Sequence, residues 1–318
     1  REGCFNHILS LMKSFFKKNH SGLRKGAAAT IAGVTALAVS FGSTSLAVAQ
    51  PLAPSGVHSS AASLVNRGEA MRTPAPYAGA TFDSGLKIGK VPAKPGMLMN
   101  TVRLDPKVGL SAAGQQFRFS YSTTNQHGAV APSTGAMFFP KGKPPAGGWP
   151  VLAWAHGTVG LADQCTPSMN PRSARDTDYL NHWLNQGYAI VASDYAGMST
   201  DGLMSYLNGK STAANVVDSV IAAQDLPAVR QGGQTLSRNW AVIGQSQGGG
   251  AALHVALRAT SRSKEANLNF IGTVATGAPA YVEEIVLAGS PTFPPVPLPA
   301  GLNTYAMYIL AAFRLSLI

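Results

Sequence analysis

The sequence predicts an α/β fold with one mostly parallel sheet, preceded by an antiparallel pair of strands. From about residue 150 onward, short continuous apolar runs alternate with helix-like stretches. Such runs are typical of parallel strands that are buried on both faces. The tight sequence GQSQG also separates a strand-like run from a helix-like one at residues 244–248. At 318 residues, the chain is long enough to bury a full-sized core.

The antiparallel pair is predicted between residues 116 and 139. A strand should begin at Gln116, because three aromatic residues then alternate with polar ones. A turn at Asn125–Gly128 leads to a partner strand, Gly135–Phe139, and the two strands should form a hairpin.

The parallel part is predicted from apolar runs and from apolar residues at helical spacing. We expect Pro227 to end the helix before it and an apolar helix to occupy Thr304–Ile318. The other expected elements are the strand Pro150–Ala155, the helix Ala174–Gln186, the strand Tyr188–Ser193, the helix Thr212–Ala223, the strand Trp240–Ile243, a helix ending near Arg258 and the strand Phe270–Ala275.

The first 49 residues have the pattern of a signal peptide. Met12 is followed by a basic region, an apolar stretch over Ala27–Val39 and the A-x-A site Ala47–Ala49. We therefore expect translation to start at Met12, cleavage after Ala49 and a secreted protein, extracellular or in the cell envelope. An N-terminal anchor helix is the alternative, but the apolar stretch is short for a membrane span. Residues 50–95 are rich in Pro, Ala, Ser and Gly and predict a flexible lead-in, and residues 96–318 are the predicted α/β domain.

Charge and composition argue against several classes of partner and cofactor. The net charge is +11, but six of the basic residues lie in residues 1–49 and the others are scattered singly. Without a basic cluster interleaved with aromatic residues, nucleic-acid binding is disfavoured. No phosphate-binding loop, metal-ligand cluster or cofactor motif is found, so no cofactor is expected. Cys165 is the single cysteine after the predicted cleavage site, which leaves it either free or paired outside this sequence.

Ser246 is the candidate nucleophile. A G-x-S-x-G sequence between a strand and a helix is typical of a nucleophile elbow, in which the serine sits in a strained backbone conformation. Gly244 and Gly248 must then lack a Cβ so that strand and helix can approach, and Gly249 and Gly250 should allow close packing on the sheet. The alternative is a glycine-rich turn with an incidental serine.

A second turn, His156-Gly157-Thr158, follows the strand Pro150–Ala155. A turn at this place can present a backbone N–H to the nucleophile. We expect the N–H groups of Thr158 and Gln247 to form an oxyanion hole. His156 is expected to hold this turn by hydrogen bonds, and a role as catalytic base is the less favoured alternative.

Several ordered segments resemble the bacterial branch of the secretory lipase family of α/β-hydrolases. They are WPVLAWAHGTVG, ADQCTPS, ASDYAGMSTDGLMSYLNG, GQSQGGGAAL and VATGAPAYVEE, and the resemblance covers Pro95–Ile318. It implies an α/β-hydrolase sandwich that acts as a secreted lipase or carboxylesterase. It also implies a serine–acid–histidine triad and a helical cap that begins near residue 280.

The acid and the base of the triad are not found. In this fold they follow the serine in the chain, but the only later histidine is His254, on the helix of the elbow itself. The later acids are Glu265, Glu283 and Glu284. Glu283 follows the strand after the elbow, where a surface or cap-helix role is expected and a role as orienting acid is the less favoured alternative. Asp194 is expected to be a hydrogen-bonded structural carboxylate, and a catalytic role is the less favoured alternative. We therefore expect the acid, the histidine and the last strands to lie beyond Ile318, in a sequence that stops early.

The sequence thus predicts a secreted serine hydrolase that cleaves acyl esters through an acyl-enzyme on Ser246. An acyltransferase on the same fold and a non-catalytic binding protein are the alternatives. The expected partners are lipid or other acyl-ester substrates, and transient contact with a membrane or lipid surface is compatible with them. No particular oligomeric state is indicated.

Overall fold

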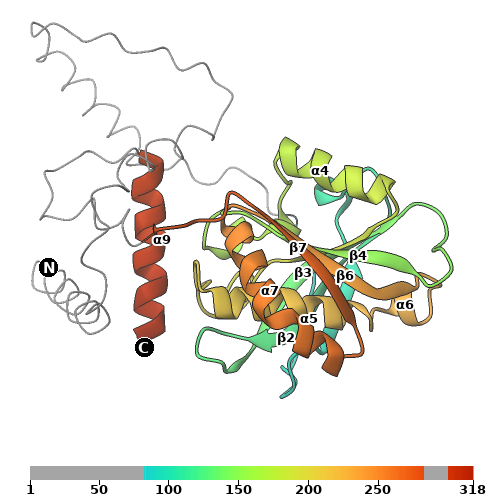
Figure 1. Ribbon diagram of the computed structural model, residues 1–318, viewed down its shortest axis with the longest axis horizontal. Helices are drawn as coiled ribbons and strands as arrows, with labels where there is room; N and C mark the ends of the chain where they lie inside the picture. Colours follow the sequence, from blue (N-terminus) through green and yellow to red (C-terminus); the bar gives the residue numbers. More distant parts are fainter. Residues whose placement is uncertain (1–81, 83, 283–299, 318) are drawn as a thin grey trace, which may run out of the picture. The chain divides into compact units, whose positions relative to one another are not determined.

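A computed structural model describes residue 82, residues 84–282 and residues 300–317 (Figure 1). These residues belong to the second of two compact units of the chain, Ala75–Ile318. The predicted signal peptide, most of the lead-in and the two glutamates Glu283 and Glu284 lie outside the described residues.

The described part of the chain has one seven-stranded sheet in the order β1-β2-β3-β5-β4-β6-β7. β4 lies in the interior of the sheet and pairs in parallel with β5 and β6, and β6 pairs in parallel with β7. The other pairs are antiparallel. The predicted α/β fold is therefore confirmed. The strands are β1 (Leu98–Arg103), β2 (Ala113–Thr124), β3 (Val130–Pro140), β4 (Trp149–Ala155), β5 (Ala189–Ser193), β6 (Leu236–Gln245) and β7 (Asn269–Thr276).

The antiparallel part is larger than predicted. β2 and β3 form the expected hairpin, but β1 adds a third strand that was not predicted from the sequence. The register of β1 shifts between Leu98 and Asn100, and its residues are only partly buried. Because a bulged edge strand of this kind has no clear alternation of apolar and polar residues, its sequence resembles a loop.

Helices cover both faces of the sheet. Along β4, Val151, Ala153 and Ala155 belong to the core that includes α5 and α7, whereas Leu152 and Trp154 face the core that includes α4. Figure 1 shows α4 on one side of the sheet and α5 and α7 on the other. The α-helices are α4 (Ala174–Asn185), α5 (Gly209–Ala223), α6 (Pro227–Arg230), α7 (Gln247–Glu265) and α9 (Ala300–Leu317), and short 3₁₀ turns occupy Pro106–Val108, Asp163–Cys165 and Pro167–Met169.

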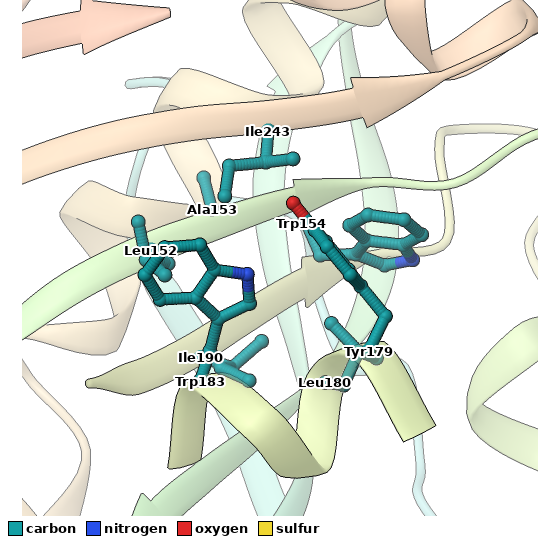
Figure 2. Close-up of a pocket in the computed structure, with 8 residues that line it drawn as sticks. All are labelled: Leu152, Ala153, Trp154, Tyr179, Leu180, Trp183, Ile190 and Ile243. Atoms are coloured by element: carbon teal, nitrogen blue, oxygen red, sulfur yellow. The ribbon is translucent and has the colours of Figure 1, made fainter. Parts of the chain in front are cut away.

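The face covered by α4 is closely packed. Tyr179, Leu180 and Trp183 lie over the apolar side chains of β4, β5 and β6 (Figure 2). The rings of Tyr179 and Trp154 have centroids 5.7 Å apart. The space left between these side chains is only about 10 Å³, roughly that of one water molecule. This face therefore acts as core.

Three helix boundaries differ from the prediction. α5 begins at Gly209 because the Asn208 side chain accepts a hydrogen bond from the Ser211 N–H and caps the helix. α9 begins at Ala300, four residues before the predicted Thr304. α5 ends at Ala223 as predicted, and Pro227 opens the short helix α6 as its first residue. α7 continues past Arg258 to Glu265.

The C-terminal helix α9 forms where the apolar run predicted it. Tyr308, Ile309 and Ala311 pack against the core, and Ala312 is 5% exposed. Within the described ranges, no helix has the length and apolar character needed to cross a bilayer.

Candidate active site

Ser246 occupies a sharp turn between β6 and α7. Its backbone angles are φ 57° and ψ −124°, a strained combination for a residue other than glycine. The turn is held on both sides, since the Ser246 N–H donates to the Thr276 carbonyl at 2.9 Å and its own carbonyl accepts from the Gly250 N–H at 3.1 Å. The strand, turn and helix that the G-x-S-x-G pattern predicts are therefore present.

The flanking glycines allow this turn to exist. A Cβ added to Gly248 would lie 2.5 Å from the carbonyl carbon of Ala155 on β4, and one added to Gly244 would overlap the Gly248 carbonyl. A Cβ on Gly249 would lie 2.7 Å from the Thr276 carbonyl oxygen. Gly250 differs, because its added Cβ would meet only the Pro279 ring, at an ordinary 3.6 Å. The expectation that Gly250 is needed for close packing is therefore wrong.

The turn after β4 lies against the serine turn. β4 and β6 are parallel neighbours in register at Ala155 and Gly244, so both chains leave the sheet at the same edge. A Cβ added to Gly157 would lie 3.6 Å from the Ser246 Cβ, which shows how closely the two turns approach. The structure thus brings the Thr158 turn beside Ser246 and Gln247.

Side chains hold the two residues from which oxyanion donors are expected. The Thr158 Oγ1 and the Tyr206 hydroxyl are hydrogen-bonded at 2.8 Å. Gln247 is 2% exposed, and its side-chain amide donates to the Met204 sulfur at 3.7 Å. Tyr206 and Met204 both lie in the segment ASDYAGMSTDGLMSYLNG that carries the family resemblance, but nothing in its pattern indicates these two contacts.

His156 is a structural residue of this turn. It is 4% exposed, and its Nδ1–H donates to the Gly157 carbonyl at 2.7 Å. Its ring stacks on Tyr195 with a centroid separation of 4.3 Å, and the Tyr195 hydroxyl donates to the His156 carbonyl at 3.1 Å. Burial lowers the pKa of His156, which favours the neutral form of the ring.

Asp194 is a buried, hydrogen-bonded carboxylate behind the site. It is 1% exposed and accepts from the Ser168 N–H at 2.9 Å, the Ser168 hydroxyl at 2.5 Å and the Thr134 hydroxyl at 2.7 Å. These bonds anchor the start of a loop in which Tyr195 and Ser199 both have positive φ. Asp194 therefore has the structural contacts expected from the sequence.

A base for Ser246 does not emerge from the described residues. The His254 ring packs so closely on Gly209, at the start of α5, that a Cβ there would overlap it. Glu265 lies at the far end of α7, where its carboxylate is 3.3 Å from the Arg262 guanidinium. Among the described residues, no hydrogen bond joins the Ser246 hydroxyl to a histidine.

Cys165 packs against Gly160, just after the turn of Gly157 and Thr158. Its sulfur faces Gly160 so closely that a Cβ on that glycine would lie 2.9 Å from the Cys165 Cβ and closer still to the sulfur. The thiol is free and half-buried. In the described ranges, no group of three or more His, Cys, Asp or Glu side chains could hold a metal ion.

Comparisons with known proteins point to lipases. A family model described as secretory lipase matches residues 172–292. No curated protein sequence matches the chain. Among solved structures, lipase A of Candida antarctica is similar with a TM-score of 0.54 and 18% identity, over 70% of this chain and 49% of that one.

Two further solved structures share the fold. A candidate hydrolase from Legionella pneumophila has a TM-score of 0.54 and 22% identity, over 69% of this chain and 61% of that one. The rice cell wall degrading esterase LipA from Xanthomonas oryzae has a TM-score of 0.50 and 23% identity, over 61% of this chain and 53% of that one. The chain spans about half to three-fifths of the length of these proteins. These matches confirm the α/β-hydrolase fold and the resemblance to the secretory lipase family, whose model covers residues 172–292 of this chain.

Proposed function

We propose that this protein is a secreted serine hydrolase that cleaves carboxylic esters of the lipase or esterase type. The observation that carries the proposal is the strained Ser246 turn, with the turn of Gly157 and Thr158 packed against it. Strain of this kind is characteristic of functional sites, where it presents a reactive side chain. The match to the secretory lipase family supports an ester as the substrate and export as the destination.

In the proposed mechanism, the Ser246 hydroxyl attacks the ester carbonyl and gives up its proton to a base. The backbone N–H groups of Thr158 and Gln247 stabilise the oxyanion, and each such donor contributes about 2.7–4 kcal/mol to transition-state stabilisation. The carbon–oxygen bond to the alcohol then breaks, and the alcohol takes up the proton. Water hydrolyses the resulting acyl-enzyme in a second step. We place the base and its acid outside the described residues.

Replacing Ser246 by Ala tests this role in the protein as its host produces it. Hydrolysis of short- and long-chain esters should fall by about 10⁴-fold or more. Ser261→Ala is a matched control, because Ser261 is an exposed serine on the same helix. A fluorophosphonate should also modify Ser246 covalently. Ester hydrolysis that survives in Ser246→Ala, or labelling at another serine, would refute the assignment.

The N-terminal sequence of the exported protein tests the proposed processing. Removal of residues 1–49 should leave Gln50 as the N-terminal residue. A protein whose N-terminus lies before Met12 would contradict the proposed signal peptide.

A further inference from the structure

A cavity of about 390 Å³ begins beside the serine turn, and we call it the α7 cavity. Four residues of α7 line it, namely Gln247, Gly250, Ala251 and His254. Their spacing of three, four and seven positions places them on one stripe of the helix. With a rise of about 1.5 Å per residue, this stripe extends roughly 10 Å along α7 from the neighbour of Ser246. The remaining walls come from α5, α9, the segment before α5, and Pro279 and Val282 after β7.

The lining residues of the α7 cavity favour an uncharged ligand. Its wall on α9 includes Ile309, Ala312 and Phe313. None of the described residues that line it is an aspartate, glutamate, lysine or arginine. Because transfer of an ion into such surroundings without a partner is very unfavourable, carboxylates and phosphates do not fit the site.

Three residues of the lining also have polar atoms that need partners. The Ser205 hydroxyl, the Gln247 side-chain carbonyl and the His254 Nδ1 are buried, and within the described residues they have no hydrogen-bond partner. By contrast, the Thr212 hydroxyl, which also belongs to the lining, has a partner, since it donates to the Asn208 carbonyl at 2.9 Å. Buried polar groups of this kind gain from a ligand that supplies their missing hydrogen bonds.

We propose that the α7 cavity binds an uncharged aliphatic group that carries hydroxyl groups. The aliphatic part packs against α9, and a hydroxyl pairs with Ser205, Gln247 and His254. Because the cavity begins at Gln247, the group belongs to an ester that reacts at Ser246, a step that rests on the proposed function. The same chemistry is found in a hydroxylated acyl chain and in the polyol part of an ester.

Calorimetric titration of the full chain carrying Ser246→Ala tests the binding without catalysis. The probes are 1,2-octanediol and octanoate, which differ in the charge of the polar end. We expect the diol to bind and octanoate not to bind. Absence of diol binding, or tighter binding of octanoate, overturns the proposal.

Filling the cavity provides the matched comparison. Gly250→Leu places a side chain in the cavity, where only the Pro279 ring lies near the Cβ position, and leucine is a better helix former than glycine. It should weaken diol binding by about tenfold or more. Ala256→Leu, at an exposed position of the same helix, should leave binding within about twofold. Equal effects of the two variants would place the diol elsewhere.

The polar residues are tested by His254→Phe and Ser205→Ala. Each should weaken diol binding by about three- to tenfold, the usual effect of one lost hydrogen bond. Unchanged affinity in both would show that the hydroxyl groups are not recognised there.

Displacement of bound 1,2-octanediol by esters shows which part of the substrate occupies the α7 cavity. Glycerol monooctanoate should displace the diol if the polyol part binds, and methyl 8-hydroxyoctanoate should displace it if the acyl chain binds. Displacement by neither overturns the link to the substrate. Since these titrations use Ser246→Ala protein, they can fail while the hydrolysis test succeeds, and the reverse also holds.

Discussion

Replacing Gly248 by Ala should destabilise the protein far more than the same change at Gly250, two positions further along α7. The new methyl group at residue 248 would lie 2.5 Å from the carbonyl carbon of Ala155, 2.7 Å from the His156 carbonyl oxygen and closer still to the Ala155 oxygen. Such contacts are essentially never below 3.0 Å, so α7 and β4 must separate by at least 0.5 Å. These are backbone atoms of the central sheet, which cannot turn aside as a side chain can.

The expected cost of Gly248→Ala is about 3 kcal/mol or more, at the upper end of the range for overpacking. Gly250→Ala meets only the Pro279 ring at 3.6 Å and should instead stabilise α7 by about 0.5–1 kcal/mol through helix propensity. The two variants should therefore differ by about 4 kcal/mol in the free energy of unfolding.

Urea denaturation of wild type and both variants measures this difference, with the m value checked for a constant change in exposed surface. Gly248→Ala should also reduce the reactivity of Ser246, because the movement of α7 displaces the turn. A Gly248→Ala protein within about 0.5 kcal/mol of the wild type would refute the packing argument. A loss of stability in Gly250→Ala as large as that in Gly248→Ala would refute it equally.

Three further perturbations test the buried polar groups. As the pH is lowered below about 6.5, the free energy of unfolding should decrease, because the unfolded chain protonates His156 more readily than the folded one. The slope is at most about 1.4 kcal/mol per pH unit. His156→Phe should lack this part of the pH dependence in urea titrations. Asp194→Ala should cost about 3 kcal/mol in the same assay, because the N–H and hydroxyl of Ser168 lose their acceptor, whereas Asp194→Asn should cost less. Asp218→Ala removes a contact of 3.0 Å to Arg262; because the arginine is 29% exposed, we expect a loss of only about 1–3 kcal/mol, seen as a lower melting temperature.

The parallel strands and the serine turn could be predicted because their residues satisfy local rules. β4 and β5 are continuous apolar runs, which suit central strands covered on both faces. The glycines on either side of Ser246 are required by a turn that the pattern itself specifies. By contrast, β1 was missed because a bulged, half-exposed edge strand has no periodic signal.

The surroundings of the site could not be predicted for a different reason. The hydrogen bond between Thr158 and Tyr206 and the packing of His254 on Gly209 join residues about 45 positions apart. Contacts of this kind depend on how the helices settle on the sheet, and no local pattern encodes them. The N-cap of α5 was not predicted either, because Asn208 precedes the apolar stripe on which the prediction of this helix was based.

The order of strands in the sheet also determines when the candidate site can form during folding. β4 and β6 are neighbours, yet the paired residues Trp154 and Ile243 are 243 − 154 = 89 positions apart. The loop between them must close before the two turns can meet, and parallel pairing over such distances is intrinsically slow. Helices such as α7 can gain structure early, whereas the proposed reactivity of Ser246 should appear only after β4 and β6 have paired. Recovery of Ser246 labelling by a fluorophosphonate should therefore follow the last steps of refolding. The circular dichroism signal of the helices should recover earlier.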